Sequence, residues 1–150
     1  MRTVRAISAL VVAMGTLVLV WMMSAALVRA AEGSAWEAPG RAARKPNPVA
    51  MSPTSIAVGK TVYTKECQAC HGTGGKGDGP AGAFLTPKPS DLTNAKVWEQ
   101  SDGALFWKIT EGRKPMPSYE KTLTDEQRWS VVNYMRSTFA PKSSAPAPQK

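Results

Sequence analysis

Three stretches of the chain place apolar residues at the three- and four-residue intervals of an α-helix. The first stretch begins at Ser52 or Thr54, and Pro53 suits its first turn, where the missing amide breaks no hydrogen bond. Its apolar face consists of Ile56, Gly59, Val62 and Tyr63. Gly59 is a poor helix former, so it indicates either the close approach of another helix or simply a weak helix.

The second and third stretches have clear boundaries. The second is expected to begin with Ser101 as its N-cap and to end at Gly112, and its apolar stripe is Leu105, Phe106 and Ile109. In the third, Thr124 and Gln127 have the spacing of a capping box, and Asp125 and Glu126 favour the positive end of the helix dipole. Its apolar positions are Trp129, Val132, Met135 and Phe139, and Pro141 stops the run.

The remainder of the chain shows no pattern typical of a β-strand. Residues 72–92, between the first two helices, contain six glycines and three prolines. Loops of this length are uncommon in compact domains and usually have a function. The sequence therefore predicts a small all-α domain whose apolar residues alone make a thin core.

The N-terminus carries an export signal. Arg2 and Arg5 are followed by an uncharged run from Ala6 to Val28, 23 residues long, and by a small-residue cleavage signature at Val28-Arg29-Ala30. The run is also long enough to span a bilayer. Cleavage near Ala30 and a retained membrane anchor therefore remain as alternatives, and both place the rest of the chain outside the cytoplasm.

The sequence predicts four segments. Residues 1–30 form the export signal, whether cleaved or not, and residues 31–53 form a Pro- and Ala-rich linker or surface arm. Trp36 is unusual for a free linker, so this segment either docks on the domain or stays apart from it. Residues 54–140 form the folded domain, and residues 141–150 form a low-complexity tail that is expected to be disordered.

Charge adds little to this picture. The net charge is +8, from 19 Lys and Arg against 11 Asp and Glu, and three of the arginines lie in the export segment. This moderate excess suits acidic protein partners. No long basic run interleaved with aromatic residues occurs, so a nucleic-acid partner is not expected.

The chemistry-bearing residues are few and contiguous. The chain has two cysteines and one histidine, and all three lie in Cys67-Gln68-Ala69-Cys70-His71. Three such residues cannot supply the four protein ligands of a structural zinc site. The pattern C-x-x-C-H is the attachment sequence of a c-type haem. Two thiols one helical turn apart suit the two vinyl groups of one haem, and the next residue offers an imidazole to the iron.

Two other interpretations of the motif remain, a redox dithiol and a plain disulfide. A thioredoxin-like dithiol belongs to a βαβ context, and none is visible. Covalent haem c is therefore the expected cofactor, and it would also supply the apolar mass that the thin core lacks.

The second axial position of the iron needs another ligand, and no second histidine exists. Met116 lies between Pro115 and Pro117, which stiffen the backbone around a weak thioether ligand. Met135 is expected to be a core residue, and Met51 lies in the Pro-rich arm. We therefore expect His71 and Met116 to bind the metal; the alternative for Met116 is an ordinary surface-loop methionine.

The chain resembles the class I cytochromes c, which are small electron carriers with a single haem. The resemblance covers about residues 55–139 and rests on CQACH, GKGDGP, KPMP and RWSVVNYMRS. It implies a cytochrome c-like fold in which the first and last helices cross with a glycine at the contact, here Gly59. It also implies that Pro80, in Gly79-Pro80, offers its carbonyl to the imidazole N–H of the proximal histidine; otherwise Pro80 is a simple turn residue.

The resemblance predicts single-electron transfer rather than catalysis, in the bacterial periplasm or at the outer face of the membrane. Trp98, Phe106, Trp107 and Tyr119 are expected to pack around the haem, and Lys76, Lys88, Arg113 and Lys114 either border its edge or are ordinary solvated charges. The expected partners are a redox donor and acceptor, or a membrane oxidoreductase complex. Membrane contact is expected only if the N-terminal segment is retained.

Three functional hypotheses follow. The chain is a free or tethered electron shuttle, a haem subunit of a larger oxidoreductase or respiratory complex, or a haem enzyme such as a peroxidase. Ligation by Met116 favours the first two, because a fully ligated iron offers no site to a substrate.

Overall fold

The computed structural model describes residues 36–142, so the predicted export signal and all but the first two residues of the tail lie outside the described residues. By its contacts the chain divides into a unit of residues 1–37 and a larger unit of residues 38–150. Its elements are α2 (Gly40–Ala43), α3 (Pro53–Val62), a π-helical turn η1 (Tyr63–Cys67), α4 (Gln68–His71), a 3-10 turn η2 (Gly82–Phe84), α5 (Ala95–Trp98), α6 (Asp102–Glu111) and α7 (Asp125–Phe139). Residues 36–142 contain no strand, which confirms the all-α prediction.

The three long helices begin where the sequence places their caps. Ser52 caps α3, and Ser101 accepts a hydrogen bond from the amide of Ala104 at 3.2 Å at the start of α6. Thr124 and Gln127 form the predicted capping box of α7. These side chains satisfy amides that the first helical turn leaves without a backbone partner, so they fix where each helix starts.

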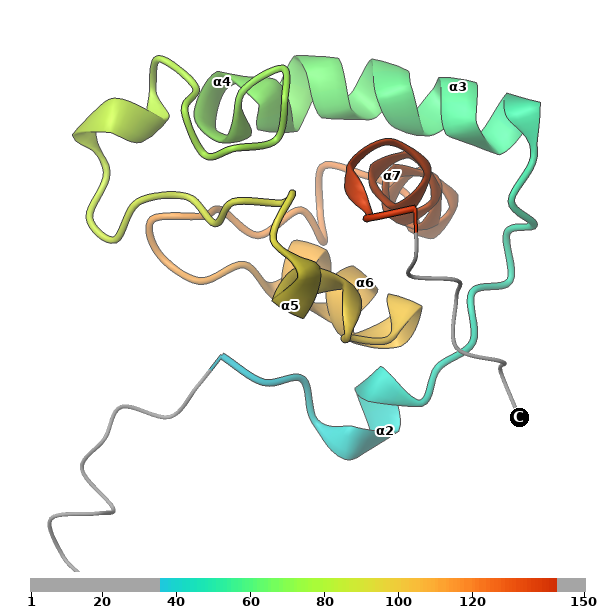
Figure 1. Ribbon diagram of the computed structural model, residues 1–150. Coiled ribbons are helices and arrows are strands. Elements are labelled where there is room, and N and C mark those ends of the chain that lie inside the picture. Colours follow the sequence, from blue (N-terminus) through green and yellow to red (C-terminus); the bar gives the residue numbers. More distant parts are fainter. Residues whose placement is uncertain (1–35, 143–150) are drawn as a thin grey trace, which may run out of the picture. The chain divides into compact units, whose positions relative to one another are not determined.

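Helices α3 and α7 cross closely. Figure 1 shows α7 almost end-on beneath α3. A Cβ atom added at Gly59 would overlap the backbone carbonyl of Ser130, so the glycine is present because another helix approaches its backbone. Beside this contact, the ring of Tyr63 lies 5.3 Å from the rings of both Tyr134 and Phe139. The predicted crossing of the first and last helices is thus confirmed.

Helix α6 forms the next layer of the core. The ring of Phe106 stacks on Trp129 of α7 with 4.0 Å between ring centroids. A largely buried ion pair joins Arg136 to Asp102 at 2.7 Å, and the same guanidinium lies 5.3 Å from the ring of Trp98. These contacts tie α7 to the segment that carries α5 and α6.

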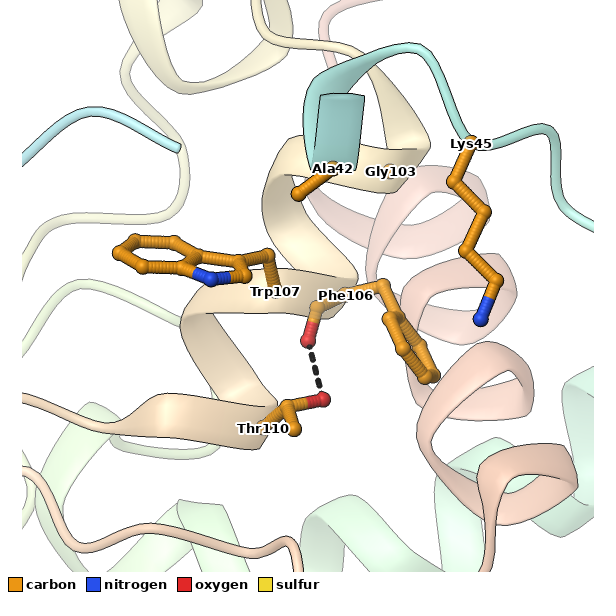
Figure 2. Close-up of a pocket in the computed structure, with 6 residues that line it drawn as sticks. All are labelled: Ala42, Lys45, Gly103, Phe106, Trp107 and Thr110. Carbon is orange, nitrogen blue, oxygen red and sulfur yellow. Dashed lines mark hydrogen bonds between the residues drawn. The ribbon is translucent and has the colours of Figure 1, made fainter. Parts of the chain in front are cut away.

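The N-terminal arm, residues 38–52, packs on the domain. The hydroxyl of Ser101 donates to the carbonyl of Ala43 at 2.5 Å, and backbone carbonyls of the arm lie so close to Gly103 that a side chain there would collide with them. The ammonium of Lys45 lies 4.8 Å from the ring centroid of Phe106. Figure 2 shows the small open pocket that remains between this part of the arm and Trp107.

Asn133 fixes the rest of the arm. This side chain is buried in α7. It accepts a hydrogen bond from the side-chain amide of Asn47 at 2.8 Å and donates one to the carbonyl of Val49 at 3.0 Å. It also donates to the hydroxyl of Ser55 at 3.2 Å, so the arm and the start of α3 share one anchor. No helix in the described part of the chain has both the length and the apolar character needed to cross a membrane.

Candidate functional site

The motif CQACH lies on a short helical segment that continues α3. The turn Tyr63–Cys67 is π-helical, so the amide of Gln68 donates to the carbonyl of Tyr63 five residues earlier. Such wide turns recur at functional sites. Helix α4 follows and carries Cys70 and His71, and both cysteines are partly buried and free. We call Tyr63–His71 the attachment segment.

The surroundings of Cys67 differ from those of a redox-active thiol. Burial, with smaller contributions from the carboxylate of Glu66 and the thiol of Cys70, raises the pKa of the Cys67 thiol to about 12. Redox dithiols depend instead on a lowered pKa, produced by positive charge or a helix N-terminus. The surroundings of Cys67 therefore favour a neutral thiol that can add to a vinyl group over the reactive thiolate of a thioredoxin-like dithiol.

The imidazole of His71 is oriented by one backbone carbonyl. Its Nδ1 lies 3.1 Å from the carbonyl oxygen of Ser90, and burial lowers the pKa of the ring. A neutral ring that donates from Nδ1 keeps the lone pair of Nε2 available to a metal. The contact to His71 Nδ1 in this structure comes from the Ser90 carbonyl. Pro80, for which the resemblance implied such a contact, is exposed, and its role stays a prediction.

The glycine-rich loop, residues 72–92, folds back onto the attachment segment. Its amides donate to three consecutive carbonyls of the motif, in the pairs Ala81 to Ala69 at 2.9 Å, Gly79 to Cys70 at 3.2 Å and Gly77 to His71 at 2.9 Å. A Cβ atom at Gly79 would overlap the Ala69 carbonyl, so the close approach requires glycine. The loop thus satisfies the carbonyl groups that a short helix leaves unpaired.

Met116 lies in a tight turn after α6. Gly112 ends the helix with a φ of 67°, and Arg113 and Met116 then exchange two backbone hydrogen bonds of 3.0 and 2.9 Å. The Met116 side chain is partly buried against the hydrophobic core, as is Cys67. Met135 is a buried core residue, as predicted, and Met51 is 49% exposed. We call residues 112–119 the ligand loop.

Two contacts of the site have no clear signal in the sequence. Ser90 acts through its backbone carbonyl, which every residue type possesses. Tyr119, one of the aromatic residues expected to pack around the haem, uses its hydroxyl to donate to the carbonyl of Glu66 at 2.8 Å, next to Cys67. A tyrosine among apolar neighbours indicates burial but not the atom to which it donates.

The rim of the site mixes charged and apolar groups. Lys76, Lys88, Arg113 and Lys114 are all exposed, on the loops that surround the attachment segment. Phe84, in η2, is 89% exposed, and the backbone of the neighbouring Gly82 lies against the carbonyl of Cys70. These side chains are therefore all accessible from solvent.

The donor set suits one haem c group. Two free thiols are available for thioether bonds, an oriented neutral imidazole can bind iron, and a partly buried thioether lies on a separate loop. When bound, haem supplies an iron that gains or loses one electron.

Comparisons with known proteins agree with this donor set. Residues 54–135 match the family described as "Cytochrome C oxidase, cbb3-type, subunit III". The chain is 34% identical over 91 residues to a cytochrome c6 of Rippkaea orientalis, covering 58% of this chain and 78% of that protein. It is 32% identical over 112 residues to a thiosulfate dehydrogenase of Stutzerimonas stutzeri, covering 71% of this chain but only 34% of the relative.

One solved structure is also similar. A chain of the reducing HAO-like protein complex of Kuenenia stuttgartiensis matches with a TM-score of 0.55 and 32% identity, over 61% of this chain and 46% of that chain. This chain thus spans about a third of the thiosulfate dehydrogenase and less than half of the complex subunit. The cytochrome c fold, the attachment motif and these matches show that the chain binds haem c covalently and belongs to the cbb3-type subunit III family of class I c-type cytochromes, as an electron carrier or a subunit of an oxidoreductase.

Proposed function

We propose that this chain transfers single electrons through a haem bound by thioethers to Cys67 and Cys70, with His71 and Met116 as axial ligands of the iron. The observation that carries the proposal is the hydrogen bond between His71 Nδ1 and the Ser90 carbonyl, at 3.1 Å. It holds the ring as the tautomer whose Nε2 can bind the metal. A histidine kept only for packing would need no such orientation.

Met116 is the best thioether ligand in the described part of the chain. Met135 is buried in the core and Met51 is 49% exposed, whereas Met116, like Cys67, is partly buried against the hydrophobic core. A His/Met pair raises the reduction potential relative to bis-His ligation. It also occupies both axial positions, so we propose that the chain is a carrier and not an enzyme.

The main alternative is a haem subunit within a larger oxidoreductase. The thiosulfate dehydrogenase relative is about three times as long as the matched region, and the similar solved structure belongs to a complex. The packed arm would then present a second surface to neighbouring subunits. A peroxidase-like enzyme has less support, because it needs an iron with an open axial position.

We further propose that the chain acts outside the cytoplasm, in the periplasm or at the outer face of the membrane. Residues 1–30 would serve as export signal, cleaved near Ala30 or retained as an anchor. Residues 54–140 form the electron-transfer domain, and residues 141–150 form a tail. The partners are then redox proteins, among them a membrane oxidoreductase complex.

A visible spectrum of the purified native protein tests the ligand assignment. We expect a six-coordinate, low-spin iron and, in the oxidised protein, the weak near-infrared band of sulfur-to-iron charge transfer. Met116→Ala should abolish this band, lower the potential and open the iron to carbon monoxide.

Two matched variants complete the experiment. Met135→Leu, a core substitution of similar volume, should leave the band in place. A wild type that is high-spin and binds carbon monoxide readily would refute the carrier and favour the peroxidase-like enzyme. If Met51→Ala removes the band instead, the function stands and the ligand assignment is wrong.

A further inference from the structure

The attachment segment and the ligand loop belong to different parts of the fold. Residues 63–71 continue α3, whereas residues 112–119 connect α6 to α7. Among the hydrogen bonds of residues 36–142, the one from the Tyr119 hydroxyl to the Glu66 carbonyl, at 2.8 Å, is the only one that joins them directly. Glu66 immediately precedes Cys67, and Tyr119 follows Met116 by three residues. The contact therefore joins the residue before Cys67 to the loop that carries Met116.

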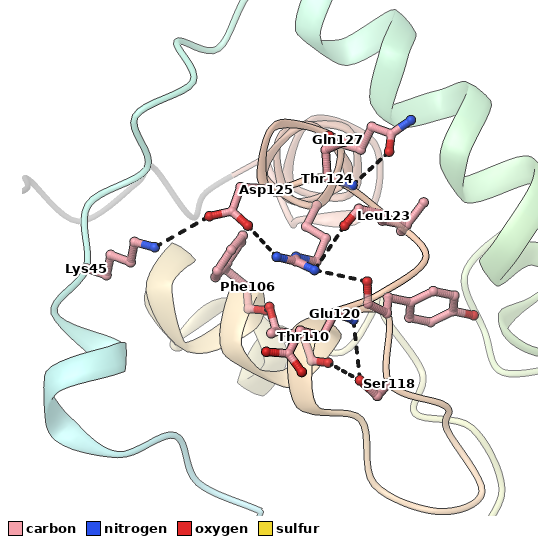
Figure 3. A network of polar contacts seen from close by, with 11 residues as sticks. Lys45, Phe106, Thr110, Ser118, Glu120, Leu123, Thr124, Asp125 and Gln127 are labelled. Atoms are coloured by element: carbon pink, nitrogen blue, oxygen red, sulfur yellow. Dashed lines mark hydrogen bonds and ion pairs between the residues drawn. The ribbon is translucent and has the colours of Figure 1, made fainter.

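The backbone of Tyr119 is itself held firmly. Its amide donates to the carbonyl of Ile109 at 3.2 Å, and its carbonyl accepts from the Arg128 guanidinium at 2.9 Å. Arg128 is 4% exposed, also donates to the carbonyl of Leu123 at 3.0 Å and pairs with Asp125. Figure 3 shows this network, in which the loop is tied to the first turn of α7.

A second contact fixes the same part of the loop. The hydroxyl of Ser118 donates to the carbonyl of Thr110 near the end of α6, at 2.6 Å. The base of the ligand loop is thus rigid with respect to α6 and α7. The loop is held to the attachment segment by the hydrogen bond from the Tyr119 hydroxyl.

The Tyr119 hydroxyl can donate its hydrogen bond throughout the physiological pH range. Tyr119 is 8% exposed, and burial, with the nearby Cys67 and Glu66, raises the pKa of its phenol. The group stays protonated over the whole physiological range, and its acceptor is a backbone carbonyl that does not titrate. The contact consequently does not switch with pH.

We propose that Tyr119 is a positioning residue that holds the ligand loop against the attachment segment and so keeps the Met116 thioether on the iron. The inference rests on the proposed ligation by Met116. Loss of the hydroxyl would let the loop open more often while both helices stay in place. An external ligand would then compete more successfully for the sixth position.

Titration of the oxidised holoprotein with imidazole tests this role. Imidazole binds only when the methionine leaves, so its apparent affinity reports how often the loop opens. Tyr119→Phe keeps the ring and removes one buried hydrogen bond, and we expect roughly threefold to tenfold tighter imidazole binding. The sulfur-to-iron band should also disappear at a lower temperature, whereas the helical circular dichroism should melt nearly as in the wild type.

Tyr134→Phe is the matched control. Tyr134 packs on the rings of Tyr63 and Phe139, and among the described residues no hydrogen bond is assigned to its hydroxyl. Imidazole affinity in this variant should equal that of the wild type.

The outcomes separate the two proposals. A wild type without the sulfur-to-iron band would reject ligation by Met116 itself. A wild type with the band, but with equal imidazole affinity in Tyr119→Phe, would reject the positioning role alone. Equal gains in affinity for both tyrosine variants, with a matching loss of helix stability, would also reject it.

Discussion

The α3–α7 crossing and the two loops beside the attachment segment are held together in different ways. At the crossing, Gly59 lets two backbones touch, and the buried rings of Tyr63, Trp129 and Phe139 surround the contact. Residues 72–92 and 112–119 have little regular structure and are fixed mainly by backbone hydrogen bonds. The crossing is stabilised by packed side chains, whereas the loops depend on backbone hydrogen bonds.

This difference has a functional meaning. A tightly packed crossing gives the domain a rigid frame, which tolerates few substitutions. Loops fixed by hydrogen bonds open locally at lower free energy than the core. Substitutions at the crossing should therefore act on folding, and substitutions in the loops should act first on the ligation of the iron.

The largest effect is expected at the crossing. In Gly59→Ala the added methyl group would overlap the Ser130 carbonyl and the Cβ of Tyr134, and backbone atoms cannot move aside. We expect the free energy of unfolding to fall by about 3 kcal/mol or more, at the upper end of overpacking effects. Denaturant unfolding of the holoprotein, followed by circular dichroism, measures the change.

Gly74→Ala is the control in the loop region. The nearest atom to a Cβ there is the Cγ of Lys76 at 4.0 Å, so we expect a change within about 0.5 kcal/mol. Similar stabilities for the two alanine variants would show that the crossing is looser than described.

A smaller effect is expected at the base of the ligand loop. Gly112 has a φ of 67°, and a Cβ there would also collide with the backbone of Pro117. Gly112→Ala should cost about 1–3 kcal/mol as local strain. Because the strain falls on the loop, the sulfur-to-iron band should weaken before the helices melt. Simultaneous loss of the two signals on heating would contradict the separation of loop and crossing.

The smallest effect is expected in the loop that carries Ser90. The hydroxyl and the amide of Thr93 bind the carboxylate of Asp91 and lower its pKa below the usual value. A carboxyl group whose pKa is lower in the folded than in the unfolded state stabilises the protein at pH values above its unfolded-state pKa. This stabilisation is lost as the pH falls through the folded-state pKa. Asp91→Asn should therefore lose slightly less stability than the wild type between pH 7 and pH 2.5.

Paired denaturant titrations at the two pH values measure that difference. Thr93→Val should act in the same direction, since it removes the hydroxyl that contributes most to the shift. An Asp91→Asn profile that is identical to the wild type would mean that this turn contributes nothing to acid stability.

The sequence was sufficient to predict the three long helices. Ser52, Ser101 and Thr124 mark the helix starts because capping depends on local side chains and short spacings. The short helices α2 and α5 escaped prediction, since a single turn is too short to show a helical period. The packing of the arm was left open, because it depends on distant partners such as Gly103 and Asn133.

The sequence predicts the reactive atoms of the candidate site but not the hydrogen bonds that position them. Cys67, Cys70 and His71 form a contiguous motif, and two prolines point to Met116. The carbonyl oxygen 3.1 Å from His71 Nδ1 belongs to Ser90, and a backbone acceptor leaves no trace in residue type. The role of Pro80 stays a prediction. The hydrogen bond from Tyr119 to Glu66 spans 53 residues, and no local pattern encodes such a pair.

The contact between Gly59 and Ser130 also bears on the order of events during maturation. These residues are 71 positions apart, as 130 minus 59, so their meeting has a high contact order, which slows folding. Under the proposed export from the N-terminus, residues 67–71 would emerge before α7. Haem attachment to the cysteines could then precede formation of the α3–α7 crossing.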